Sequence, residues 1–64
     1  MKYSIKQIIF DDRGNRGQIV NVTSDRSGRD IYQILFDKDW ETGHADYLPE
    51  EKIFTQSEFN KYYK

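Results

Sequence analysis

Apolar and polar residues alternate along three stretches of this chain, with the period of two that is typical of half-buried β-strands. The three stretches are residues 3–10, 17–24 and 30–37. In the third stretch, Tyr32, Ile34 and Phe36 lie on one face of the expected strand. The other face also carries apolar residues, which indicates a central strand. In the first stretch the apolar face shifts, which predicts a bend near Gln7.

Two shorter strands are predicted further along the chain, at residues 44–48 and 52–54. In the first of these, Ala45 and Tyr47 share a face. The turn between the two strands contains Pro49, whose fixed φ and missing N–H interrupt a strand. Polar segments with glycine connect the predicted strands, at residues 11–17, 24–30 and 38–43.

Residues 55–64 have a different pattern and predict a short helix. Thr55 followed three residues later by Glu58 matches a capping box, which marks a helix N-terminus. Phe59 shares a helical face with the tyrosine pair that follows it. Because so short a helix does not hold alone, we expect Phe59 to dock on the strands or on a partner. Of the two tyrosines, we expect one to dock and one to stay exposed.

Composition limits the kinds of fold that the pattern allows. The chain has 64 residues and no cysteine, so a single domain must be held by its apolar core without disulfides. Five tyrosines, four phenylalanines and one tryptophan make that core rich in aromatic side chains. Five short strands, separated by turn signals about every ten residues, favour a small barrel or sandwich.

Three segments of the chain resemble the running pattern of Src-homology-3-like (SH3-like) barrels. They are Gly17-Gln-Ile-Val-Asn-Val, Tyr32-Gln-Ile-Leu-Phe-Asp and Ala45-Asp-Tyr-Leu-Pro-Glu-Glu-Lys-Ile. A glycine opens the second strand, an aromatic strand ends in Phe-Asp, and a Tyr-Leu-Pro-Glu turn leads to the last strand. The pattern is most similar to KOW and Tudor modules and to the small stromal subunit of photosystem I.

The resemblance covers residues 3–54 and implies an all-β fold, a five-stranded SH3-like barrel with a short C-terminal helix. We therefore expect a barrel at residues 1–54 and a helix at 55–64 that packs on the same domain. The helix is not part of the family pattern, and the basic strand of ribosomal KOW modules is missing. Because SH3-like folds host many functions, the resemblance transfers none of them.

The arginines form the first candidate site. The net charge is −1, yet all four arginines lie in the first two loops, at Arg13, Arg16, Arg26 and Arg29. In an SH3-like barrel these loops flank one groove, so the resemblance implies that the arginines gather at one end and bind phosphate or carboxylate. Alternatively, aspartates of the same loops neutralise them locally: Asp11, Asp12, Asp25 and Asp30.

The acidic segment after residue 36 is not a metal loop. Asp37, Asp39 and Glu41 begin like a calcium-binding EF-hand, but Gly43 is one position late and Leu48 stands where a glutamate ligand is required. His44 is the only histidine, and the chain has no cysteine to share a zinc ion with it. We predict no catalytic residue, no metal and no cofactor.

The aromatic residues divide between core and surface. Tyr32, Phe36 and Tyr47 alternate as core residues do, and we expect all three to be buried. Trp40 lies among charged residues in the middle of a loop, where the pattern gives no reason for burial. It either folds back as a lid over an open end of the barrel or stays exposed as a contact for a partner.

We expect a non-enzymatic binding module that contacts a protein partner through Asp39, Trp40 and Glu41, as adaptors and inhibitors do, including those of phages and mobile elements. The first alternative is nucleic-acid binding by the four loop arginines, and the second is an accessory subunit of an enzyme complex. No apolar stretch approaches the length of a membrane helix, and no signal peptide is evident. We accordingly expect a cytoplasmic protein, monomeric or weakly dimeric.

Overall fold

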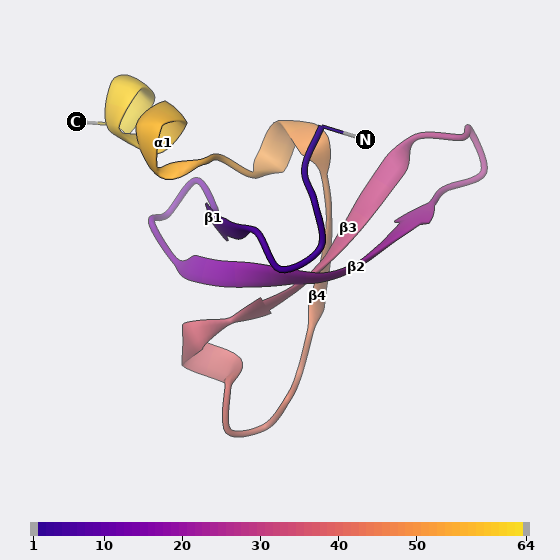
Figure 1. Cartoon of the computed structure of the whole chain (residues 1–64), viewed down its shortest axis with the longest axis horizontal. Coiled ribbons are helices and arrows are strands. Elements are labelled where there is room, and N and C mark those ends of the chain that lie inside the picture. Colours follow the sequence, from indigo (N-terminus) through magenta and orange to yellow (C-terminus); the bar gives the residue numbers. More distant parts are fainter. Residues whose placement is uncertain (1, 64) are drawn as a thin grey trace.

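The computed structural model describes residues 2–63, so Lys64, the end of the predicted helical segment, lies outside the described residues. The chain is mostly β, with one antiparallel sheet of four strands in the order β1-β2-β3-β4 and a short C-terminal helix, α1 (Figure 1). The strands are β1 (Ile8–Phe10), β2 (Arg16–Ser24), β3 (Asp30–Phe36) and β4 (Asp46–Pro49). The helical segments are η1 (Asp37–Asp39), η2 (Glu50–Lys52) and α1 (Gln56–Tyr63).

Only the last three residues of the predicted first strand form a strand. β1 starts at Ile8, and the residues before it make a turn in which Gln7 N–H donates to Ser4 O at 3.1 Å. Lys6 has a φ of 76°, in the left-handed region that side chains other than glycine rarely adopt. Lys6 N–H still donates to Ile19 O at 2.7 Å, which keeps the turn beside β2. The bend predicted near Gln7 is therefore confirmed, but the strand before it is not.

β2 is the longest strand and carries a bulge. Its pairing with β3 shifts between Ile19 and Asn21, so Val20 is the extra residue. Such an insertion bends the strand and increases its twist. The bent strand pairs with β1 through its first three residues and with β3 from Gly17 to Ser24.

The predicted fifth strand, at residues 52–54, is reduced to one bridge. Lys52 belongs to η2, and Phe54 pairs with Phe10 of β1 through two hydrogen bonds. Phe10 N–H donates to Phe54 O at 2.7 Å, and Phe54 N–H donates to Phe10 O at 2.8 Å. Phe54 thereby covers the edge of β1 that does not pair with β2.

Seven side chains form the core, each with no more than 2% of its surface exposed: Tyr3, Ile9, Ile19, Tyr32, Ile34, Phe36 and Ile53. Val22 and Leu48 pack against them. β3 supplies three of the seven, which confirms the predicted inward face of that strand. The core lies on the side of the sheet that the N-terminal turn and Ile53 cover.

Tyr47 was expected in the core, and this prediction is wrong, because 60% of its surface is exposed. The register pairs Tyr32 with Leu48 and Gln33 with Tyr47. Residues opposite each other in a sheet point to the same side, so Leu48 follows Tyr32 inward. The strand lies at 46–49 and not at 44–48, and the side chain that faces the core is the neighbour of the expected one.

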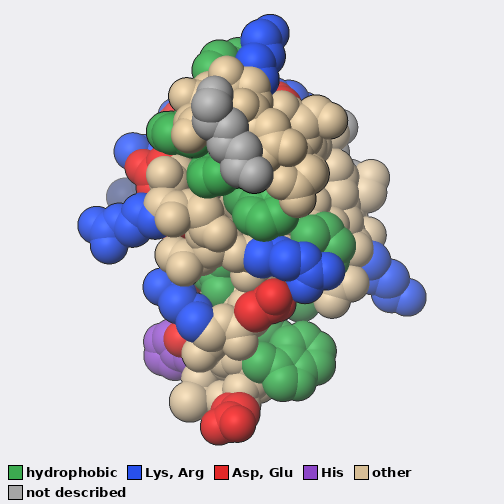
Figure 2. Space-filling view, turned by 90° about the vertical axis from the view of Figure 1, so that its left-hand side faces the viewer, with side chains coloured by type: hydrophobic (Ala, Val, Ile, Leu, Met, Phe, Trp, Pro, Cys, Tyr) green, Lys and Arg blue, Asp and Glu red, His purple; other side chains and the backbone are tan. Residues whose placement is uncertain are grey.

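α1 begins with the predicted capping box. Glu58 N–H donates to Thr55 Oγ1 at 3.2 Å, and Thr55 N–H donates to Glu58 Oε1 at 3.0 Å. Phe59 docks on β1, its ring centroid 5.7 Å from that of Phe10, as predicted. Figure 2 faces the side of the molecule that carries α1, and hydrophobic side chains are visible around it.

Neither tyrosine near the end of α1 is buried. Their exposed fractions are 62% for Tyr62 and 50% for Tyr63, although both rings lie near Phe54. Tyr63 also stacks on Phe59 with ring centroids 5.0 Å apart. The pair therefore covers Phe54 from outside without entering the core, and the expected division into one docked and one exposed ring is not seen.

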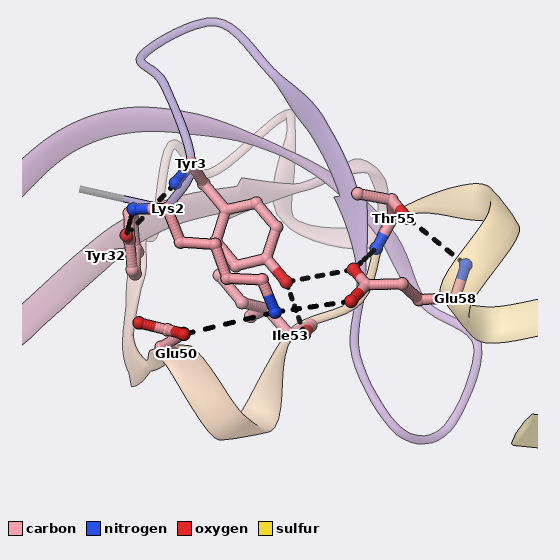
Figure 3. Close-up of polar contacts among 7 residues, drawn as sticks. All are labelled: Lys2, Tyr3, Tyr32, Glu50, Ile53, Thr55 and Glu58. Carbon is pink, nitrogen blue, oxygen red and sulfur yellow. Dashed lines mark hydrogen bonds and ion pairs between the residues drawn. The ribbon is translucent and has the colours of Figure 1, made fainter.

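Glu58 joins the helix to the start of the chain (Figure 3). Its carboxylate accepts a hydrogen bond from Tyr3 Oη at 3.0 Å and lies 3.3 Å from Lys2 Nζ. Tyr32 Oη in turn accepts from the backbone N–H groups of Lys2 and Tyr3 at 3.1 and 3.2 Å. Three distant segments of the chain meet in this group, which we call the Glu58 network: Lys2, Tyr3, Tyr32, Thr55 and Glu58.

Gly17→Ala should destabilise the fold, because a Cβ at this buried position would lie 2.8 Å from both Ile34 Cγ2 and Phe36 Cδ1. Overpacking of this kind costs about 1–3 kcal/mol. Gly28→Ala is the control, since nothing lies within 4 Å of its added Cβ and only its φ of +84° opposes the change, at a cost of about 1 kcal/mol. Urea unfolding measures both, and a smaller loss for Gly17→Ala than for Gly28→Ala would contradict the packing described.

Glu58→Gln should destabilise the protein most at neutral pH. Backbone hydrogen bonding from Thr55, with Tyr3 and Lys2, lowers the pKa of Glu58 from 4.5 to about 2. The carboxylate therefore contributes stability that is complete above pH 4.5 and is lost as the pH falls through 2. Urea unfolding at about pH 7 and about pH 2.5 should show the gap between wild type and variant closing with acid.

The matched control is Glu41→Gln, which removes the same charge from the exposed β3–β4 loop. It should change stability little at either pH. Asp25, whose pKa also lies at about 2, is present in all three proteins and cancels in the comparison. A gap for Glu58→Gln that stays constant between the two pH values would disprove the role given to its carboxylate.

Candidate interaction surface at the β3–β4 loop

The loop between β3 and β4 is folded into consecutive turns. Trp40 N–H donates to Asp37 O at 3.2 Å, which closes η1. Gly43 N–H and Thr42 Oγ1 both donate to Asp39 O, at 2.9 and 3.1 Å. Gly43 has a φ of +69°, where glycine carries no steric cost. The loop thus holds its shape through its own backbone, with Asp39 O as the shared acceptor.

Trp40 lies at the tip of this loop and is 65% exposed. Of the two alternatives for this residue, the lid is therefore wrong and the exposed position is correct. Asp39 beside it is half-buried, and Glu41 is exposed. Figure 2 shows hydrophobic surface at the lower end of the molecule, where the β3–β4 loop lies, with acidic side chains around it. The three residues predicted to contact a partner are consecutive on one folded tip.

An ion pair joins the base of this loop to the start of β2. Arg16 Nη1 lies 3.0 Å from Asp37 Oδ2, and more than half of each side chain is exposed to solvent. Exposed pairs of this kind contribute about 0–1 kcal/mol. Its main effect is to occupy the guanidinium of Arg16.

The expectation that the four arginines gather at one end is wrong. Arg13 and Arg16 lie before or at the start of β2, whereas Arg26 and Arg29 follow its end. A strand of nine residues spans about 26 Å. The two loops occupy opposite sides of Figure 1, because consecutive antiparallel hairpins place their turns at opposite ends of the shared strand.

Local neutralisation by aspartates of the same loops accounts for one of the four arginines, Arg29, which lies 3.2 Å from Asp25 and also 3.3 Å from Glu51. Arg16 pairs instead with Asp37, which lies outside both loops. Within residues 2–63, the side chains of the other two arginines form no ion pair with a described residue. Neither loop therefore concentrates free guanidinium groups.

The two arginine-bearing loops share a turn that sequence reasoning missed. In each, an aspartate carboxylate oxygen, of Asp11 or Asp25, accepts from the backbone N–H groups two and four residues later at 2.8–3.0 Å. In each, a glycine three residues after the aspartate has a positive φ, 86° at Gly14 and 84° at Gly28. The signal is Asp-x-x-Gly in DDRGN and DRSGR, the pattern of a type I turn followed by a left-handed residue.

This turn changes the role of the aspartates. The Ser27 hydroxyl, followed by Arg29 N–H, lowers the pKa of Asp25 to about 2. The pKa of Asp11 is also lowered, by hydrogen bonds from the Asn15 side chain and backbone that outweigh its burial. Both carboxylates are thus primarily turn acceptors, and only the one at Asp25 also faces an arginine.

A hollow of about 400 Å³ lies beside the base of the loop, between the β1–β2 turn and β4. Phe36, Leu48 and Pro49 are its apolar lining. Its charged lining comprises three cations and three carboxylates: Arg13, Lys38, Lys52, Asp11, Asp12 and Asp46. Because these charges balance, the hollow offers no net attraction to an anion or a cation.

Within residues 2–63, no three His, Asp or Glu side chains are placed to hold a metal ion together. No helix in the same range is long and apolar enough to cross a membrane. No family model, no curated protein and no solved structure matches this chain.

Trp40→Ala should leave the fold intact, because a side chain that is 65% exposed contributes little to the core. Thermal unfolding followed by circular dichroism should shift by less than about 2 °C. Ile34→Ala is the contrast, since Ile34 is fully buried and its truncation should lower the midpoint by about 8 °C or more. A large drop for Trp40→Ala would mean that the indole packs against the core after all.

Proposed function

We propose that this protein is a non-enzymatic binding module that engages a protein partner through Asp39, Trp40 and Glu41, in the manner of an adaptor or inhibitor. The observation that carries the proposal is the exposure of the single tryptophan, 65%, on a loop that is held by its own hydrogen bonds. An indole exposed to water adds nothing to the stability of the loop that carries it. On a contact surface, the same indole contributes binding energy when a partner buries it.

Physical chemistry supports this use of the tip. Tryptophan is enriched among the residues that dominate binding energy in protein interfaces. Burying the exposed part of one indole contributes roughly 3 kcal/mol. The loop already has its shape, so little ordering entropy opposes binding. Asp39 and Glu41 flank Trp40 in the sequence, so the partner should offer an apolar pocket with a basic rim.

We also infer that the fold is a five-stranded SH3-like barrel. The bridge between Phe10 and Phe54 extends the strand order to 54-β1-β2-β3-β4, with Phe54 on the edge of β1 opposite β2. The single turn η2 leads from β4 to this last segment, as the Tyr-Leu-Pro-Glu resemblance implies. A fifth strand longer than one bridge, closing beside β4, would complete the barrel.

The nucleic-acid alternative has weaker support. Its basis was one patch of four arginines, but the arginines lie in two groups and half of them face carboxylates. The second alternative, an accessory subunit of an enzyme complex, would use the same contact with a protein. It differs from the proposed function only in the identity of the partner.

Trp40→Ala should abolish capture of the partner, whereas Tyr62→Ala should leave it unchanged. The two aromatics are matched, at 65% and 62% exposed, but lie on different elements. Tagged wild type and both variants would be compared by affinity capture from host lysate with quantitative mass spectrometry. The captured partner, once purified, should bind Trp40→Ala at least about tenfold more weakly.

Equal recovery of the same partner by wild type and Trp40→Ala would refute the proposal. Recovery of nucleic acid instead of protein, with a steep loss as salt is raised, would favour the arginine alternative.

A further inference from the structure

The side of the sheet that faces away from the core carries no charged residue over most of its length. We call this surface the outer face, and it comprises Ile8, Gln18, Val20, Asn21, Thr23, Ile31, Gln33, Leu35, Tyr47 and Pro49. The Arg16–Asp37 ion pair bounds it at one end, and the β2–β3 turn bounds it at the other. Charged residues make up 33% of the chain, so a face of ten residues without one is a distinct feature.

The pairing of the strands fixes which residues belong to the outer face. Tyr32 and Ile34 point into the core, so Ile31, Gln33 and Leu35 point outward from β3. Cross-strand pairing forms three outward rows: Ile8 with Gln18 and Leu35, Asn21 with Gln33 and Tyr47, and Thr23 with Ile31 and Pro49. The bulge adds Val20, which is 40% exposed.

The composition of the outer face is that of an interface centre. Charged residues are depleted from the middle of protein interfaces, and tyrosine is enriched there. Here aliphatic side chains alternate with amides and hydroxyls, and Tyr47 is 60% exposed. Within residues 2–63 the Gln33 amide, at the middle of the central row, has no hydrogen-bond partner.

We propose that the outer face binds a second copy of this chain, with a two-fold axis passing near Gln33. In a two-fold interface the same patch meets itself, so any charge near the axis faces a like charge. A charge-free face avoids that repulsion. Amides and hydroxyls both donate and accept hydrogen bonds, so identical rows of them satisfy each other. This contact lies beyond the Trp40 loop and does not depend on it.

The area of the face sets the strength of the pairing. Three strands and seven residues of β3 cover about 14 Å by 23 Å, or about 320 Å². A stable interface buries about 800 Å² per partner. The dimer should therefore be weak, populated at concentrations of about 0.1–1 mM and dissociated well below them.

The test uses paired charges at the axis. Sedimentation velocity at about 0.05–1 mM should show wild type moving from monomer toward dimer, with little dependence on salt. Gln33→Glu alone and Gln33→Lys alone should remain monomeric, because each places like charges against each other. A one-to-one mixture of the two variants should associate again, and this association should weaken as salt is raised.

Controls separate this face from other surfaces and from loss of folding. Ser57→Glu adds the same charge on α1 and should associate as wild type does. If either Gln33 variant unfolds, the pair Tyr47→Glu and Tyr47→Lys replaces it, because an exposed edge strand tolerates charge. Wild type that stays monomeric at about 1 mM overturns the proposal. Variants that associate as wild type does, or a mixture that fails to associate, overturn it equally.

Discussion

The alternation of side chains along β3 is the constraint on which the rest of the structure depends. Tyr32, Ile34 and Phe36 have between 0% and 2% of their surface exposed and supply nearly half of the fully buried core. β3 is also paired on both edges, with β2 and β4. Once its inward face is set, the register of both neighbours determines which of their side chains are buried. A chain of this length without disulfides has no second core to compensate for a slipped register.

The ends of the chain are fastened to this strand by polar contacts. The Tyr32 hydroxyl on β3 accepts hydrogen bonds from the backbone N–H groups of Lys2 and Tyr3. The Tyr3 hydroxyl in turn donates a hydrogen bond to the Glu58 carboxylate of α1. Aromatic packing of Phe10 on Phe59 supports the same helix from β1. Packing and hydrogen bonding therefore converge on α1, although none of its residues is fully buried.

Local signals made much of this fold predictable. The bounds of β2 and β3 were expected to within one residue, and the capping box placed α1 correctly, because both depend on short-range periodicity. Non-local features were missed. The turn at Lys6 depends on hydrogen bonding to Ile19, and the choice of Leu48 over Tyr47 for the core depends on pairing with β3. The sequence showed Trp40 to be out of pattern, but only the structure decided between lid and exposed contact. The separation of the arginines and the charge-free outer face follow from strand pairing and have no local signal.

Two surfaces without a structural role distinguish this molecule, the Trp40 tip and the outer face, and the first carries the proposed function. Trp40 is the only tryptophan in the chain, so its fluorescence reports directly on the central claim. Emission of the native protein should peak close to that of tryptophan in water, and the neutral quencher acrylamide should quench it readily. A blue-shifted emission that resists acrylamide in the native protein, and becomes accessible only on unfolding, would contradict the account.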